Sequence, residues 1–163
     1  MRKYFVVLAA AAVASLLISA VAPAAGSGRV IRFLEVDNGS ADVFTDADHN
    51  NRGSAGDSFV ASPVLYAWAK GGGRGARIGH AKIMCTLASA SGAFCQGTFF
   101  LPGGTIQGES YTPLASRIKV AVTGGTGAYA GVRGTFTSRS IRDARDADGN
   151  FVSLSADVIR LLP

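Results

Sequence analysis

Short runs of β-branched and aromatic residues dominate this chain, and each run is closed by Gly, Pro, Asn or Asp. From Arg29 onward no segment keeps the 3.6-residue period of an amphipathic helix. This pattern predicts β-strands joined by turns. The expected strands are Arg29–Asp37, Asp57–Trp68, Ala76–Leu87, Phe94–Leu101, Thr105–Tyr111, Arg117–Thr123, Gly131–Arg142 and Phe151–Leu162.

The segments between these runs favour a closed sheet. Asp148-Gly149 is a strong hairpin signal, because both central residues of such a turn must tolerate positive φ. Asn38–Gly56 is polar and is interpreted as a surface loop. Many short strands predict a sandwich or a barrel. Gly97 and Gly134 lie inside strands, as glycines at barrel bends do. We therefore expect an all-β, eight-stranded antiparallel barrel with room for side chains or one small ligand.

The N-terminus has the layout of a secretory signal peptide. Arg2 and Lys3 precede the apolar run Phe5–Ile18, and small residues follow up to Ala25. A membrane anchor is the alternative, but a spanning helix needs about 20 apolar residues. We predict cleavage of residues 1–25, a single domain over residues 26–163, no stable membrane insertion, and a secreted, periplasmic or cell-envelope location.

The charge of the chain argues against a nucleic-acid partner. The formal net charge is +5, and removing Arg2 and Lys3 leaves 5 − 2 = +3. Other arginines, Arg117 and Arg160 among them, are scattered in the sequence between acidic residues. Nucleic-acid binding normally requires a clustered basic face. We therefore expect no nucleic-acid partner.

Two cysteines, Cys85 and Cys95, flank a segment that is predicted to turn about Ala90. A hairpin folded there sets the two cysteines opposite each other, close enough for a disulfide. Exported proteins fold where disulfides persist. A Cys85–Cys95 bridge is therefore expected, with two free thiols as the alternative.

Acidic residues suggest two sites of different kinds. The segment Asp46–Asn50 alternates oxygen donors as calcium loops do, but it lacks the glycine and the final acidic residue of an EF-hand. No metal is expected. Glu35 and Asp37 are two residues apart on the first strand, so they share one face of the sheet. If that face is the barrel interior, the pair could do acid–base work; the pattern alone favours the outer face.

Several blocks, in this order, resemble the allene oxide cyclase-like and dirigent-like barrels, in the version found in exported bacterial proteins. The matching blocks are Gly56-Asp57, Leu65-Tyr66, Arg77-Ile-Gly79 through Cys85, Gln96 to Gly108, Val122 to Tyr129, and Gly131-Val-Arg-Gly134. The resemblance covers Val30 to the C-terminus. It implies an eight-stranded antiparallel barrel, often a homo-oligomer, with a mostly apolar cavity and no cofactor.

The same resemblance implies site residues. Glu35 and Asp37 lie where plant allene oxide cyclases carry a Glu-x-Asn pair, with Asp in place of Asn. Cys85 lies where those enzymes carry a cysteine, although a disulfide to Cys95 would remove its thiol. Tyr66, Phe99 and Tyr129 are candidate pocket walls. Two functions follow: a cofactor-free, isomerase-like or dirigent-like barrel that steers cyclisation or coupling of an apolar or aromatic molecule, or a non-catalytic carrier, envelope or interaction module.

Overall fold

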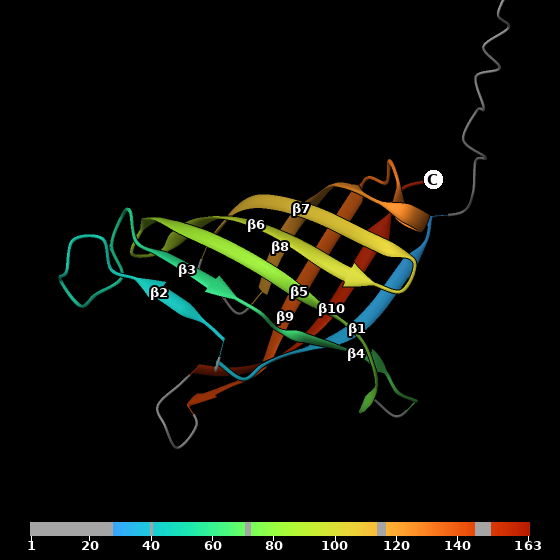
Figure 1. Ribbon diagram of the computed structural model, residues 1–163, viewed down its shortest axis with the longest axis horizontal. Coiled ribbons are helices and arrows are strands. Elements are labelled where there is room, and N and C mark those ends of the chain that lie inside the picture. The colour runs from blue at the N-terminus through green and yellow to red at the C-terminus, as the bar shows by residue number, and fades with distance from the viewer. Residues whose placement is uncertain (1–27, 40, 71–72, 114–116, 146–150) are drawn as a thin grey trace, which may run out of the picture.

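The computed structural model describes residues 28–39, 41–70, 73–113, 117–145 and 151–163, which form an antiparallel β-barrel (Figure 1). The predicted signal peptide and the predicted turn at Asp148-Gly149 lie outside these residues. The strands are β1 Val30–Asp37, β2 Val43–Thr45, β3 Ser58–Ala61, β4 Val64–Trp68, β5 Arg74–Ser89, β6 Gly92–Leu101, β7 Gly104–Pro113, β8 Arg117–Gly125, β9 Gly134–Arg145 and β10 Phe151–Leu161.

The barrel closes because β5 pairs on both sides. β6 lies along one edge of β5, while β3 and β4 pair with successive parts of the other edge. β4 also pairs with β1, and the order then continues through β10, β9, β8 and β7 back to β6. Counting β3 and β4 as one interrupted strand, and leaving out β2, which pairs with β3 outside this circuit, gives the closed eight-stranded antiparallel barrel that the sequence predicts.

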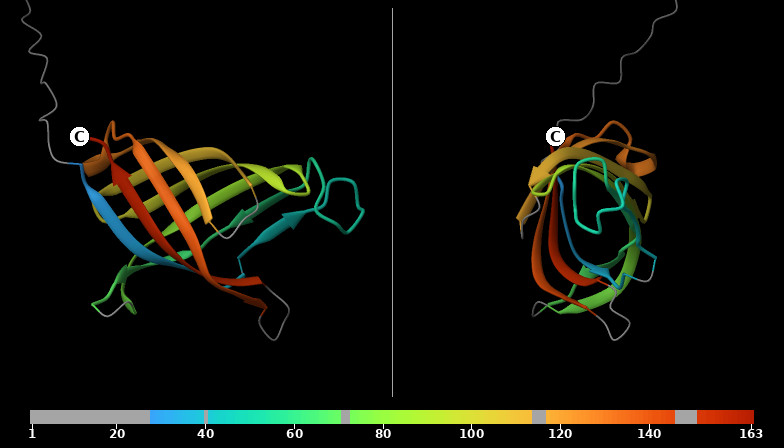
Figure 2. Two further views of the ribbon diagram at one scale, coloured as in Figure 1. Left: turned by 180° about the vertical axis from the view of Figure 1, so that it is seen from behind. Right: turned by 90° about the vertical axis from the view of Figure 1, so that its left-hand side faces the viewer.

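Two sequence expectations need correction in this region. The predicted strand Asp57–Trp68 is interrupted at Ser62-Pro63, since proline has no N–H for a sheet ladder. The carbonyl of Pro63 still accepts a hydrogen bond from the Ala81 N–H at 2.9 Å. The predicted loop Asn38–Gly56 contains β2, which pairs with β3 and extends beyond one end of the barrel (Figures 1 and 2).

The other end of the barrel is filled by side chains. Phe33, Leu65, Ile106 and Ile159 are fully buried in one apolar cluster there. The short 3-10 helix η1, Gly127–Tyr129, covers this end and adds the buried Tyr129 ring. The Gly-rich block thus serves the fold: Gly127 has φ 58°, and a Cβ there would clash with the Gly103 carbonyl.

The predicted disulfide is confirmed. Cys85 on β5 and Cys95 on β6 are direct cross-strand partners, with a Cα–Cα distance of 4.1 Å, and their sulfurs are bonded. A structural disulfide is typical of proteins that fold outside the reducing cytoplasm. Within the described part of the chain, no helix is long and apolar enough to cross a membrane.

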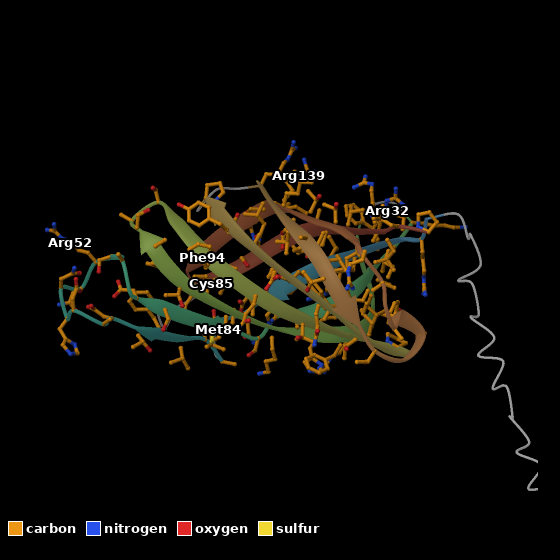
Figure 3. All side chains as sticks on the ribbon, turned by 90° about the horizontal axis from the view of Figure 1, so that it is seen from above. Arg32, Arg52, Met84, Cys85, Phe94 and Arg139 are labelled. Carbon is orange, nitrogen blue, oxygen red and sulfur yellow. A yellow bond between two sulfur atoms is a disulfide. The ribbon has the colours of Figure 1, made fainter. Side chains whose placement is uncertain are left out.

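The structure gathers arginines that look scattered in the sequence. Arg32, Arg117, Arg139 and Arg160 line one shallow groove on the outer wall of β1, β8, β9 and β10, together with Trp68. Figure 3 shows Arg32 and Arg139 on the side of the barrel away from Met84. Arg117 and Arg139 are direct cross-strand partners of like charge. The expectation that the protein has no nucleic-acid partner was based on the scatter of arginines in the sequence. The structure does not test it, so it stays a prediction.

Candidate functional site

A cavity of about 600 Å³ occupies the half of the barrel that the core leaves unfilled. Its mouth lies beside β2, where Val43 and Phe44 line it and are each more than half exposed. Figure 2, in its right-hand view, looks into the barrel from this end. Phe59, Phe99 and Phe136 form much of its wall. The cavity is therefore open to solvent at one end and mostly apolar inside.

Glu35 and Asp37 both line this cavity. Phe33, Glu35 and Asp37 are two positions apart along β1, so their side chains share one face of the strand. Phe33 is fully buried in the core, so this is the inner face. The sequence pattern alone favours the outer face for the pair, and this is wrong. Burial of Phe33, which the sequence pattern does not reveal, determines which face points inward.

Asp157 on β10 is the acidic residue that sequence analysis missed. It is the cross-strand partner of Phe33 and is fully buried, while Glu35 is paired with Ser155. Asp157 and Glu35 are therefore diagonal neighbours on the inner face, where Cα atoms are about 7–8 Å apart and long side chains meet. A signal was present: Asp157 is in period-two register with the apolar Ile159 and Leu161.

The two carboxyl groups lie in surroundings that favour their neutral forms. Burial, then the charge of Asp157 and a contact with its carboxyl group, raise the pKa of Glu35 well above its ordinary value. Burial raises the pKa of Asp157 to about 7, although Ser138, Glu35 and Ser155 partly offset the rise. None of these neighbours reaches hydrogen-bonding geometry with either Asp157 oxygen. The pair can therefore hold a proton near neutral pH.

Two further carboxyl groups lie between this pair and the mouth. Asp37 is almost fully buried, and one of its oxygens accepts a hydrogen bond from the Gly39 N–H at 3.0 Å. Asp42, just before β2, is half-buried, and burial together with the charge of Asp37 raises its pKa. One oxygen of Asp42 is buried without a hydrogen-bond partner. An acidic row thus runs from the cavity floor towards solvent.

The other predicted site residues are divided between the cavity and the scaffold. Phe99 lines the cavity, and so do Cys85 and Cys95, but their disulfide leaves no thiol for acid–base or nucleophilic work. Tyr66 does not line it: Arg74 lies over the Tyr66 ring at 4.8 Å, on the outer face. Tyr129 is buried in the core at the closed end, where its hydroxyl donates to the Pro102 carbonyl at 3.3 Å.

The calcium-like segment forms a self-contained loop. Asp46, Asp48 and Asp57 bring their carboxylate oxygens within 4.8 Å of one another. The fully buried Asp57 accepts hydrogen bonds from the N–H groups of Ala47 and Ser54 at 2.9 and 2.7 Å. Asp46 accepts from backbone N–H groups in the same way. These carboxylates therefore hold the loop together and tie it to β3.

Comparison with known proteins finds similarity in structure and not in sequence. No family model and no curated protein matches the chain. A pyocyanin demethylase matches with a TM-score of 0.59 at 24% identity, over 82% of this chain and 99% of its own. A pterocarpan synthase dirigent protein matches with a TM-score of 0.64 at 17% identity, over 83% and 96%. An exo-specific intermolecular Diels–Alderase gives 0.52 at 15%, over 81% and 99%. The predicted resemblance is thereby confirmed for the fold, and the chain has the barrel of the dirigent proteins and of these enzymes.

Proposed function

We propose that this barrel is exported, binds an apolar or aromatic small molecule in its open-ended cavity, and steers cyclisation or coupling of that molecule without a cofactor. The observation that carries the proposal is a buried carboxyl pair: Glu35 lines the mostly apolar cavity, and Asp157 lies behind it. A polar group that is buried without a hydrogen-bond partner destabilises the fold. Clusters of acidic groups with perturbed pKa values in a cavity are typical of functional sites.

The chemistry of the pair suits proton transfer within one bound molecule. Glu35 lines the cavity, whereas Asp157 lies behind it, so Glu35 is the group that contacts the ligand. Protonated Glu35 can donate to one atom of the ligand and, as a carboxylate, take a proton from another. The ligand is then isomerised with no net gain or loss of protons or electrons. The walls hold a single reactive conformer and exclude water.

Similar barrels support this proposal by analogy of fold. The solved structures of like fold include proteins named for cyclisation and cycloaddition chemistry. Fold alone does not determine function, so the site must carry the argument. A non-catalytic carrier is the second candidate, and the disulfide favours it because it removes the Cys85 thiol.

Binding inside the barrel can be tested with a neutral apolar dye and a matched pair of variants. Gly97 lines the cavity, and a Cβ placed there meets its nearest atom at 3.4 Å, which is an ordinary contact. We therefore expect a leucine at this position to extend into the cavity. Thr98 is the next residue on β6 and faces outward. We expect N-phenyl-1-naphthylamine to bind one-to-one in a fluorescence titration. Gly97→Leu should weaken binding at least tenfold, and Thr98→Leu should not. Equal binding by both variants would place the dye elsewhere.

Catalysis and export are tested on protein purified from the exported fraction. Native mass spectrometry should give a chain that begins near residue 26, its oligomeric state, and any co-purifying small molecule. That molecule is then incubated with wild-type protein and with Glu35→Gln, and isomers are separated by chromatography. Catalysis by Glu35 predicts conversion by wild type only, with binding retained in Glu35→Gln. Equal conversion, or none by either protein, supports the carrier.

A further inference from the structure

The cavity has a pronounced imbalance of charge. Glu35, Asp37 and Asp42 line it, and Asp157 lies directly behind Glu35. Among the lining residues that the structure describes there is no lysine, arginine or histidine. The cations gathered on this barrel are on the outer wall, around Arg32 and Arg139. Any ligand in the cavity therefore meets negative charge or neutral carboxyl groups, and no protein cation.

Four buried carboxyl oxygens have no hydrogen-bond donor in the described structure: Oε2 of Glu35, Oδ1 of Asp42, and both oxygens of Asp157. Leaving a buried polar group unpaired costs about 1–3 kcal/mol, and more if the group is charged. Glu35 and Asp42 line the cavity, so a positively charged ligand bound there lowers the cost of their negative charge by Coulomb attraction. A ligand carboxylate would instead add a further negative group to the acidic row.

The walls suit the same kind of ligand. Phe44, Phe59, Phe99 and Phe136 line the cavity, and the Phe99 and Phe136 rings lie 4.8 Å apart at 56°. Aromatic faces attract cations and stack on flat rings. A volume of about 600 Å³ is large enough for a molecule of two or three fused rings. Size, aromatic walls and acidic groups thus agree.

We infer that the cavity selects a flat aromatic molecule that carries a positive charge, and that it discriminates against carboxylates of the same shape. This inference depends on the proposed function, because it assumes that the cavity binds a ligand. A bound metal ion is a poorer explanation of the acidic row. Among the described residues, the group of three or more acidic side chains close enough to share one ion is Asp46, Asp48 and Asp57, in the surface loop.

Binding of such a cation should depend on pH. Without ligand, the raised pKa values of Glu35 and Asp157 keep protons on the pair near neutral pH. Asp37 and Asp42 are the other acidic residues that line the cavity, and the remaining described lining residues carry no ionisable side chain. A cation that replaces one proton binds about tenfold more weakly for each pH unit that the solution lies below the pKa of the group that releases the proton. A neutral ligand of the same shape shows no such dependence.

Three tricyclic probes of similar shape test the inference by isothermal titration calorimetry on the full mature protein. They are N-methylacridinium, neutral N-methylacridone and acridine-9-carboxylate. At pH 8 we expect the cation to bind at least tenfold more tightly than the neutral probe, and the carboxylate to bind most weakly. From pH 8 to pH 6 the cation should lose about tenfold in affinity, with proton release seen as buffer-dependent heat.

Variants connect the preference to the acidic row. Glu35→Gln should reduce the preference for the cation at least fivefold while leaving the neutral probe unchanged. Glu109→Gln, on the outer face of β7, is the control and should change neither probe. A neutral or anionic probe that binds as tightly as the cation overturns the inference, and so does failure of all three. The dye titration with Gly97→Leu decides separately whether the cavity binds any ligand, so the two proposals can fail independently.

Discussion

The buried acidic pair should make the protein less stable as pH rises. In the folded protein the pKa of Asp157 is about 7, against an ordinary value of 3.8. Between these values the folded state holds a proton that the unfolded state has lost, so the free energy of unfolding falls with increasing pH. A difference of about 3 units at about 1.4 kcal/mol each gives roughly 4 kcal/mol in total, of which about 3 kcal/mol lies between pH 5 and pH 8.

Urea unfolding at pH 5, 6, 7 and 8 measures this effect. Asp157→Asn keeps the shape of the side chain but does not titrate, so its stability should fall much less over the same range. Some slope should remain, because burial also raises the pKa of Glu35. The double variant Glu35→Gln/Asp157→Asn should be nearly flat. Glu109→Gln, which is exposed, should keep the wild-type slope. A wild-type stability that is level or rising from pH 5 to pH 8 would refute this reasoning.

Three further predictions concern the scaffold. Replacing Cys85 and Cys95 by serine should lower stability by about 3 kcal/mol, as expected for a loop of this length, in urea unfolding without reductant. Arg139→Glu turns a like-charge pair with Arg117 into an attractive one, and should raise the melting temperature by an amount equivalent to about 0.5–1 kcal/mol, less at high salt. Asp57→Ala removes the buried acceptor for the N–H groups of Ala47 and Ser54, so it should lower the free energy of unfolding by about 3 kcal/mol and speed hydrogen exchange of these two amides. Unchanged exchange would show that Asp57 does not hold the loop.

The barrel could be predicted from the sequence because its signals are local. Each signal is contained within about ten residues: runs of β-branched residues, turns that contain glycine, and two cysteines equally spaced about a turn. The strands therefore appear close to the expected places. The interruption at Ser62-Pro63 and the short β2 were missed. Pairing of β2 depends on the loop being tied down by the buried Asp57, which is a tertiary effect.

The site was harder to predict because it depends on which face of each strand points inward. The alternation of residues along the first strand shows that Glu35 and Asp37 share a face, but it does not show whether that face points into the barrel. Packing of Phe33 in the core determines that it does. Asp157 is 122 residues further along the chain than Glu35, so only the β1–β10 pairing brings them together. Tyr66 was misplaced for the same reason, since its neighbour Leu65 takes the inner face.

The position of the acidic pair argues for its role more strongly than its unusual pKa values do. A barrel stabilised only by packing would place apolar side chains at Glu35 and Asp157, as it does at Phe33 and Ile159 on the same strands. Glu35 lines the unfilled half of the barrel, and Asp157 lies directly behind it, beside the core residue Phe33. Functional sites commonly keep residues that lower the stability of the fold. Substitution at Glu35 should therefore have opposite effects: greater stability at pH 8 together with loss of the preference for a cationic ligand. A purely structural role for Glu35 would lower both or change neither.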